Sequence, residues 1–204
     1  MPTTKNKKFP LKDAPVKKRR SPISRAEGEQ RLINAAIELM AASPFSDIGV
    51  REIARAADVN HGFVHTWFGS KNDLLLAVLG ELCLRVGVRA RESGRITKIV
   101  DPADPETRLI GLLLIRLDIE GIDAWGLILQ QPFVVEQGEK YRDIWGISDK
   151  DSKAALIQGI FIWISLATFG GLTQVNQADS SFDTDDIVDL WRHLLGLLGK
   201  HPRP

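Results

Sequence analysis

Two short helical segments joined by a three-residue turn constrain the fold of this chain more than any other feature of its sequence. They lie in residues 49–68, GVREIARAADVNHGFVHTWF. A helix is expected from near Val50 to near Ala57, and Asp58-Val59-Asn60 has the composition of a tight turn. A further short helix is expected over roughly 61–68. Such a pair is either a generic helical pair or a helix-turn-helix, whose second helix enters the major groove of DNA.

The rest of the chain has helical periodicity and no convincing strand alternation, which predicts an all-α fold. Capping boxes at Ser24 with Glu27 and at Ser70 with Asp73 predict two helix starts. Helices are expected over about 24–42, 71–91, 105–119, 121–131, 133–145, 150–172 and 184–198. The segment 150–172 is apolar on nearly every side, and this pattern predicts a helix buried on both faces.

Charge is unevenly distributed along the chain, although its net charge is only +1. Residues 1–75 hold 13 Lys and Arg against 8 Asp and Glu, whereas residues 76–204 hold 14 against 18. Eight of the basic residues, among them Arg19 and Arg20, lie in the first 20 positions. Residues 1–23 are therefore expected to form a disordered basic arm. Such an arm is either a solvated tail or a segment that lies on DNA, RNA or an anionic lipid surface.

Several classes of protein are disfavoured by what the sequence lacks. No apolar run reaches the ~18 residues that span a bilayer, and the first ten residues lack the apolar core of a secretory signal. A cytoplasmic protein with no membrane partner is therefore expected. The single cysteine, Cys83, can form neither an internal disulfide nor a Cys-rich zinc site.

Catalytic and metal-binding signatures are also missing. His61 and His65 have the i, i+4 spacing of a metal site, but no Glu lies between them and no third ligand is evident, so no metal is expected. The sequence contains no nucleophile elbow, phosphate-binding loop or paired-carboxylate motif. A protein that is not an enzyme and has no cofactor is therefore expected.

The stretch 30–76 resembles the tetracycline-repressor-like (TetR) family of bacterial transcription regulators, over 47 residues or about a quarter of the chain. The resemblance is carried by Ile33-x-x-Ala36, Val50-x-x-Ile53-Ala54, Val59-x-x-Gly62, and Phe68-x-x-Lys71 followed by Leu74-Leu75. It implies a helix-turn-helix DNA-binding domain over 24–75 and a ligand-binding and dimerisation domain over 76–204. It also implies a repressor that binds a palindromic operator in double-stranded DNA as a homodimer.

The resemblance also implies which residues contact DNA. Asn60, His61 and Gly62 would lie nearest the bases, and Phe63 would press on a thymine methyl group. Further DNA contacts are expected from Arg51, His65, Thr66, Trp67, Lys71, Arg19 and Arg20. For Trp67, a position in the core is an equal alternative.

Two positions depart from the family pattern within this segment. Asp58 stands where the family usually has Gly, and Asp tolerates the left-handed backbone conformation that such a turn needs. His65 stands where the family usually has a Tyr that touches a phosphate. The turn is therefore expected to persist, whereas the operator contacts are expected to differ from the usual ones.

The C-terminal part is rich in aromatic side chains, which either fill a core or line a ligand cavity. Candidate ligand-binding residues are Arg116, Trp125, Phe133, Trp145, Gln158 and Trp163. The expected effector is a small, largely apolar molecule, with one carboxylate or hydroxyl group near Arg116. Candidate dimerisation residues, following the family's four-helix interface, are Ile160, Ile164, Leu190, Trp191, Leu194 and Leu198. The alternative is a helical scaffold or nucleic-acid-binding protein without a small-molecule effector.

Overall fold

The structure is a computed structural model that describes residues 23–43, 45–92, 104–173 and 184–201. Within these ranges every regular element is a helix, which confirms the all-α expectation. The elements are α1 (Arg25–Ala42), a 3₁₀ turn η1 (Phe45–Asp47), α2 (Val50–Ala56), α3 (Gly62–Trp67), α4 (Lys71–Glu92), α5 (Pro105–Ile119), α6 (Trp125–Leu129), α7 (Pro132–Trp145), α8 (Asp149–Thr173) and α9 (Thr184–Lys200). The basic arm, with Arg19 and Arg20, lies outside the described residues.

Side-chain caps fix the helix starts that the sequence predicts. Ser24 Oγ accepts a hydrogen bond from the backbone N–H of Glu27 at 3.2 Å, which starts α1. At the start of α4, Ser70 Oγ accepts from the N–H of Asp73 at 3.1 Å and donates to the Asp73 carboxylate at 2.6 Å. The Asp73 carboxylate therefore accepts its hydrogen bond from the Ser70 hydroxyl, whereas in the usual capping box it accepts from the backbone N–H. The helix still begins where the sequence predicts.

The helix expected over 121–131 is shorter in the structure, where α6 covers only Trp125–Leu129. Gly121 has a left-handed backbone with φ of 71°, which ends α5 in a turn. Asp123 then accepts a hydrogen bond from the N–H of Gly126 at 3.0 Å. Because the turn and this bond occupy the segment before Trp125, the helix begins four residues later than the apolar pattern indicates.

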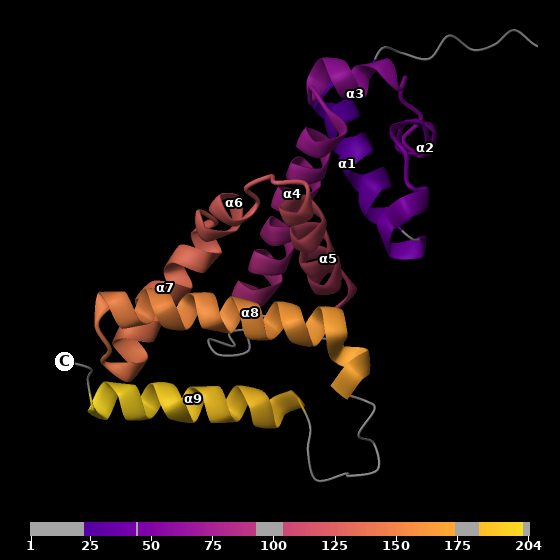
Figure 1. Cartoon of the computed structure of the whole chain (residues 1–204). Coiled ribbons are helices and arrows are strands. Elements are labelled where there is room, and N and C mark those ends of the chain that lie inside the picture. Colours follow the sequence, from indigo (N-terminus) through magenta and orange to yellow (C-terminus); the bar gives the residue numbers. More distant parts are fainter. Residues whose placement is uncertain (1–22, 44, 93–103, 174–183, 202–204) are drawn as a thin grey trace, which may run out of the picture.

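Helix α4 connects the two ends of the molecule (Figure 1). The helices α1, α2 and α3 gather at its N-terminal end, and α5, α6 and α7 pack against it. Leu74, Val78 and Leu82 of α4 are buried in a single apolar cluster that extends from α1 to α6. A second cluster joins α7, α8 and α9, with Tyr141 and Trp163 at its centre.

Helix α8 departs from two expectations. It was expected to be buried on both faces, but Ile157, Phe161 and Phe169 are exposed, with 52% of Phe161 accessible. The reason is that α5 and α7 cover only one side of it, while α9 lies alongside it (Figure 1).

By length and composition alone, Asp149–Phe169 is also apolar enough to cross a membrane, contrary to the expectation that no segment is. One such helix is weak evidence for a membrane span, because a core helix passes the same test.

Candidate nucleic-acid interface and apolar cavity

The turn between α2 and α3 has the left-handed residue that the sequence predicts. Asp58 has φ of 55°, and it is the only non-glycine residue with positive φ among those described. The N–H of Val59 bonds to the carbonyl of Ala54 at 2.9 Å, which closes the turn onto α2. Asn60 Oδ1 then accepts from the N–H of Gly62 at 2.9 Å and orders the start of α3. Part of the Asn60 side chain is therefore engaged in holding the turn.

Helix α3 presents the predicted DNA contacts on its outward side. Val64 is fully buried and anchors α3 in the core. The exposed residues of the turn and of α3 are Asp58, Asn60, His61, Gly62, Phe63, His65 and Thr66, and Arg51 is exposed at the start of α2. Thr66 Oγ1 donates to the carbonyl of Gly62 at 3.2 Å. This side of α3 therefore combines hydrogen-bonding groups with one aromatic ring.

That ring, Phe63, is stacked on Trp67 one turn later in α3. The ring centroids lie 4.4 Å apart and the planes differ by 2°. Trp67 is half-buried, and its indole lies so close to Gly28 of α1 that a Cβ at Gly28 would overlap it. Trp67 therefore packs on α1, as the core alternative expects, while its contact with DNA stays a prediction.

Lys71 lies at the first position of α4, but its ammonium group is directed back into the protein. Lys71 Nζ donates to the carbonyl of Ile48 at 2.7 Å, across a sequence separation of 23 residues. The bond ties the start of α4 to the segment that precedes α2. Lys71 therefore holds the helix-turn-helix together in this structure.

A cavity of about 70 Å³ lies between the C-terminal helices. Its lining residues are Cys83, Val86, Thr107, Ile110, Ile128, Gln131, Phe133, Val134, Ile160, Trp163 and Ile164. Of the candidate ligand residues, Phe133 and Trp163 belong to this lining. Ile160 and Ile164, which were expected at a dimer interface, also line it.

The other candidate ligand residues lie elsewhere. Arg116 is exposed, pairs with Glu120 at the end of α5 and does not belong to the cavity lining. Gln158 is exposed on α8. Trp125 packs against Phe161 with ring centroids 4.9 Å apart, and Trp145 packs on Tyr141 and Trp191 in the second apolar cluster.

The polar groups of the lining are few and uncharged. Thr107 Oγ1 donates to the carboxylate of Asp104 at 2.8 Å, and Gln131 Nε2 donates to the carbonyl of Leu127 at 3.2 Å. Burial raises the pKa of the Cys83 thiol to about 12, so that it stays protonated at neutral pH. A charged ligand would lose its hydration here without gaining a counter-charge, whereas an uncharged one would not.

Sequence reasoning missed Cys83, Thr107 and Gln131 as cavity residues. No local signal distinguishes them, because an apolar cavity has the same composition as the core around it. Only the way in which α4, α5, α6, α7 and α8 pack together leaves the space between them open.

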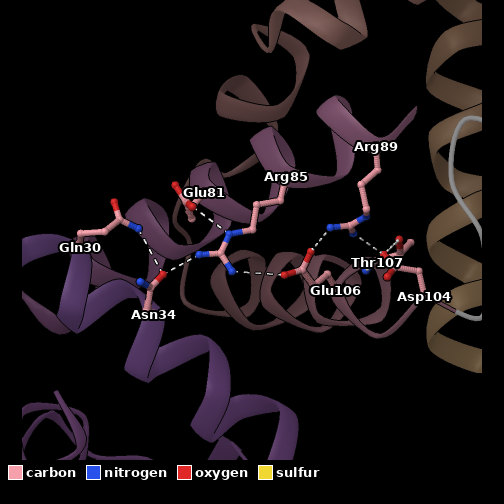
Figure 2. A network of polar contacts seen from close by, with 8 residues as sticks. All are labelled: Gln30, Asn34, Glu81, Arg85, Arg89, Asp104, Glu106 and Thr107. Carbon is pink, nitrogen blue, oxygen red and sulfur yellow. Dashed lines mark hydrogen bonds and ion pairs between the residues drawn. The ribbon is translucent and has the colours of Figure 1, made fainter. Parts of the chain in front are cut away.

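A network of charged side chains joins the N-terminal helices to one wall of this cavity (Figure 2). Arg85 of α4 donates to Asn34 of α1 at 2.5 Å, to Glu81 at 2.8 Å and to Glu106 of α5 at 3.4 Å. The hydrogen bond to Glu81 is the largest of the influences that raise the pKa of Arg85. Glu106 also accepts from Arg89 at 2.5 Å.

The network ends at the first turn of α5. Arg89 donates to Asp104 at 2.9 Å, and Asp104 caps α5 through the N–H of Thr107 at 3.1 Å. Thr107 lines the cavity. A continuous set of hydrogen bonds and ion pairs therefore runs from α1, through α4, to a residue of the cavity wall (Figure 2).

Comparison with known proteins finds a matching family model and similar bacterial regulators. The family model of bacterial regulatory proteins of the tetR family matches residues 32–78. The chain is 30% identical over 122 residues to the HTH-type transcriptional repressor Rv3405c of Mycobacterium tuberculosis (strain ATCC 25618 / H37Rv). It is equally similar to the HTH-type transcriptional regulator Mb3439c of Mycobacterium bovis (strain ATCC BAA-935 / AF2122/97). Each alignment covers 58% of this chain and 61% of the relative, so the chain spans about three fifths of the relatives it matches.

Among solved structures, the fold is similar to that of RolR in complex with its ligand resorcinol. The TM-score is 0.53 at 20% sequence identity, and the superposition covers 88% of this chain and 96% of that chain. At this identity the likeness concerns the fold alone, and it extends across the C-terminal helices. The family match falls on the helices that form the helix-turn-helix. Residues 32–78 of this chain therefore match the tetR family of bacterial regulatory proteins, and the chain is TetR-like.

Proposed function

We propose that the chain is a homodimeric repressor that binds a palindromic operator and leaves it when a small, uncharged molecule enters the cavity. One observation carries this proposal: α4 adjoins the exposed helix α3 at one end and forms a wall of the apolar cavity at the other. Residues 24–75 would act as the DNA-binding domain and residues 76–204 as the ligand-binding and dimerisation domain. The whole would work in the cytoplasm without catalysis.

The DNA-binding role is supported by the outward side of α3. His61 and Thr66 are exposed there and can bond to base edges or phosphates. Arg51 is exposed at the start of α2 and can bond to a phosphate. In the basic arm, Arg19 and Arg20 would add phosphate contacts, which strengthen binding without selecting a sequence.

The dimer is supported by apolar side chains that the single chain leaves in water. Leu190 and Leu194 of α9 are 60% and 54% exposed, and Phe161 and Phe169 of α8 are exposed as well. Leu190 and Leu194 lie one turn apart on the same face of α9, which lies alongside α8 (Figure 1). An exposed patch of this kind marks an interaction site, and a twofold pairing is the commonest way to cover it. Trp191 and Leu198 are more buried than Leu190 and Leu194, so they would pack beneath the dimer interface and would not form its surface.

The effector is inferred to be an uncharged one-ring molecule because the lining is apolar and carries no charged side chain. Resorcinol, the ligand of RolR, has these properties. Its hydroxyl groups would find hydrogen-bonding partners in Thr107 or Gln131. The effector would favour a dimer in which the two copies of α3 no longer match the spacing of the operator half-sites.

The proposal is tested first by selecting bound sites from random duplex DNA. We expect a palindrome whose half-sites lie about one helical turn of DNA, or a multiple of it, apart. His61→Ala should change the selected bases without abolishing binding, because other contacts hold the phosphates. Recovery of no preferred duplex, or a preference for single-stranded RNA, would contradict the proposal.

Effector release is tested on the selected operator with a panel of neutral one-ring phenols, resorcinol included, and their carboxylate analogues as matched controls. We expect release by a neutral compound and none by the carboxylate of the same size. Cys83→Leu, which adds side-chain volume in the cavity wall, should reduce the response while operator binding remains. Equal release by the charged analogue would show that the cavity is not the effector site.

A further inference from the structure

The indole N–H of Trp163 is a hydrogen-bond donor in the wall of the cavity. Trp163 of α8 belongs to the lining and is only 3% exposed. An indole nitrogen can donate one hydrogen bond and accept none, and a buried tryptophan usually finds a partner for it. Within the part of the chain that the structure describes, no group accepts a hydrogen bond from Trp163. This donor therefore needs a partner from outside the chain.

The nitrogen of Trp163 differs from the enclosed polar atoms of the neighbouring apolar cluster. Trp191 Nε1 and the Tyr141 hydroxyl are fully enclosed and have no hydrogen-bond partner among the described residues. Trp163 Nε1 lacks a partner as well, but it is not one of these enclosed atoms, so it borders open space. Because Trp163 is otherwise buried and lines the cavity, that open space is the cavity.

Thr107, another polar residue of the lining, cannot supply the same kind of bond. Its hydroxyl is 2.8 Å from the Asp104 carboxylate, which also accepts from Arg89 at 2.9 Å. A carboxylate paired with a guanidinium has no proton to donate, so the Thr107 hydroxyl is the donor in its bond to Asp104. Only the capacity to accept remains on Thr107. The donor that a ligand oxygen would need must therefore come from another residue of the wall.

We propose that Trp163 is a specificity-determining residue whose indole N–H donates a hydrogen bond to an oxygen atom of the effector. The effector is then an uncharged molecule that carries a carbonyl or hydroxyl oxygen, and a plain hydrocarbon of the same shape is rejected. The proposal rests on the proposed function, since it takes the cavity as the effector site. It goes beyond that function by naming the effector group that is recognised and the atom that recognises it.

The expected order of affinities is the reverse of the order of hydrophobicity. In a cavity without a donor, a ligand oxygen would lose its hydrogen bonds to water, so the matching hydrocarbon would bind more tightly. The Trp163 N–H replaces that lost bond, whereas a hydrocarbon would leave the N–H without a partner. The oxygen compound should therefore bind more tightly than a hydrocarbon of its own shape.

Acetophenone and isopropenylbenzene test this order, because they have the same shape and differ only by a carbonyl oxygen in place of a methylene group. Isothermal titration calorimetry with the full chain should show acetophenone binding about tenfold more tightly. Trp163→Phe keeps an aromatic ring but lacks the N–H, so the ratio should fall to one or below. Trp125→Phe, the matched control, changes a half-buried tryptophan outside the lining and should keep the wild-type ratio.

The indole N–H signals in nuclear magnetic resonance give a second readout, which packing alone would not move in the same way. Acetophenone should shift the N–H signal of Trp163 downfield, as formation of a hydrogen bond does, and isopropenylbenzene should not. The signal of Trp191, whose nitrogen is enclosed and outside the lining, should stay in place with both. These signals are assigned in the wild-type protein, so the test holds even if Trp163→Phe does not fold.

Failure of this inference can be told apart from failure of the proposed function. If acetophenone binds no more tightly than isopropenylbenzene, or if phenols release the operator and acetophenone does not bind, the role of Trp163 alone is overturned. The same holds if Trp163→Phe keeps the tenfold ratio, which would assign the oxygen to Gln131, the other lining residue with an N–H group in its side chain. If none of these compounds binds, the cavity is not an effector site, and both proposals fall.

Discussion

Cys83 makes the stability of the protein depend on pH in a predictable direction. Burial raises the pKa of its thiol from 9.0 to about 12, so the folded chain keeps this proton to higher pH than the unfolded chain does. The resulting stabilisation is fully present below the unfolded value and is lost as pH rises toward the folded one. Above about pH 9, the free energy of unfolding should therefore fall by up to about 1.4 kcal/mol per pH unit.

This dependence is measured by urea unfolding of the wild type and of Cys83→Ala from about pH 8 to pH 10. The variant lacks the thiol, so its stability should decline less steeply over this range. Burial also raises the pKa of Tyr141, but that group is present in both proteins and cancels in the difference. Parallel pH profiles would show that the thiol reaches water in the folded state.

At the scale of elements, the crossing of α5 and α8 depends on Gly111. A Cβ at Gly111 would overlap Thr168 Oγ1 and lie 3.0 Å from Ile164 Cγ2. Gly111→Ala should force the two helices apart and lower the free energy of unfolding by about 1–3 kcal/mol. Gly80→Ala is the matched control, because nothing lies within 4 Å of a Cβ there. That change should raise stability by up to about 1 kcal/mol through helix propensity alone.

Both values come from chemical denaturation followed by circular dichroism. If Gly111→Ala were as stable as Gly80→Ala, the α5–α8 contact would be looser than the structure shows. Since Ile164 lines the cavity, Gly111→Ala should also change the affinity for a cavity ligand, whereas Gly80→Ala should not.

The sequence predicted elements well where their causes are local. The caps at Ser24 and Ser70 depend only on residues three positions away, so the starts of α1 and α4 could be predicted from the sequence. The turn before α3 could be predicted as well, because Asp58 tolerates a left-handed backbone. The start of α6 was missed because Asp123 competes for the backbone there.

Features that depend on distant contacts could not be read from the sequence. The position of Trp67 depends on Gly28, which is 39 residues earlier, and the ammonium of Lys71 is bound by a carbonyl 23 residues away. Ile160 and Phe161 have the same apolar character, yet one lines the cavity and the other is exposed. Only the packing of α8 on its neighbours distinguishes them.

At the scale of the whole molecule, Arg85 connects three helices. Arg85→Met would remove its bonds to Asn34, Glu81 and Glu106, leaving the Glu81 carboxylate without its cation while Glu106 keeps Arg89. We expect the free energy of unfolding to fall by about 1–3 kcal/mol. We also expect an effector to weaken operator binding by a smaller factor, because the link between the cavity wall and α1 is cut.

The matched control is Arg31→Met, which removes an exposed pair with Glu27 within α1 alone. Exposed pairs contribute about 0–1 kcal/mol, so this variant should be nearly as stable as the wild type and respond fully to the effector. Unfolding in urea and operator titration with and without effector provide both readouts. An unaltered effector response in Arg85→Met would show that coupling takes another route.

The proposed dimer gives a second prediction at this scale. Leu194→Asp would place a charge in the apolar surface of α9, so the protein should sediment as a monomer and lose affinity for the palindromic operator. Leu84→Asp on α4 is the matched control, since Leu84 and Leu194 are both 54% exposed. It should remain dimeric in sedimentation velocity at micromolar concentration. Dissociation of both variants would mean that α9 has no special part in assembly.

The length of α4 has a mechanical consequence. Its 22 residues form a rod about 33 Å long, with α3 at one end and the cavity wall toward the other. A tilt of about 5° around its midpoint would displace each end by about 1.4 Å. A hydrogen bond to a base tolerates a range of only about 0.5 Å in its length. If α3 binds bases as proposed, the rod would act as a lever, and a shift in the cavity wall smaller than one bond length would move α3 by more than this range.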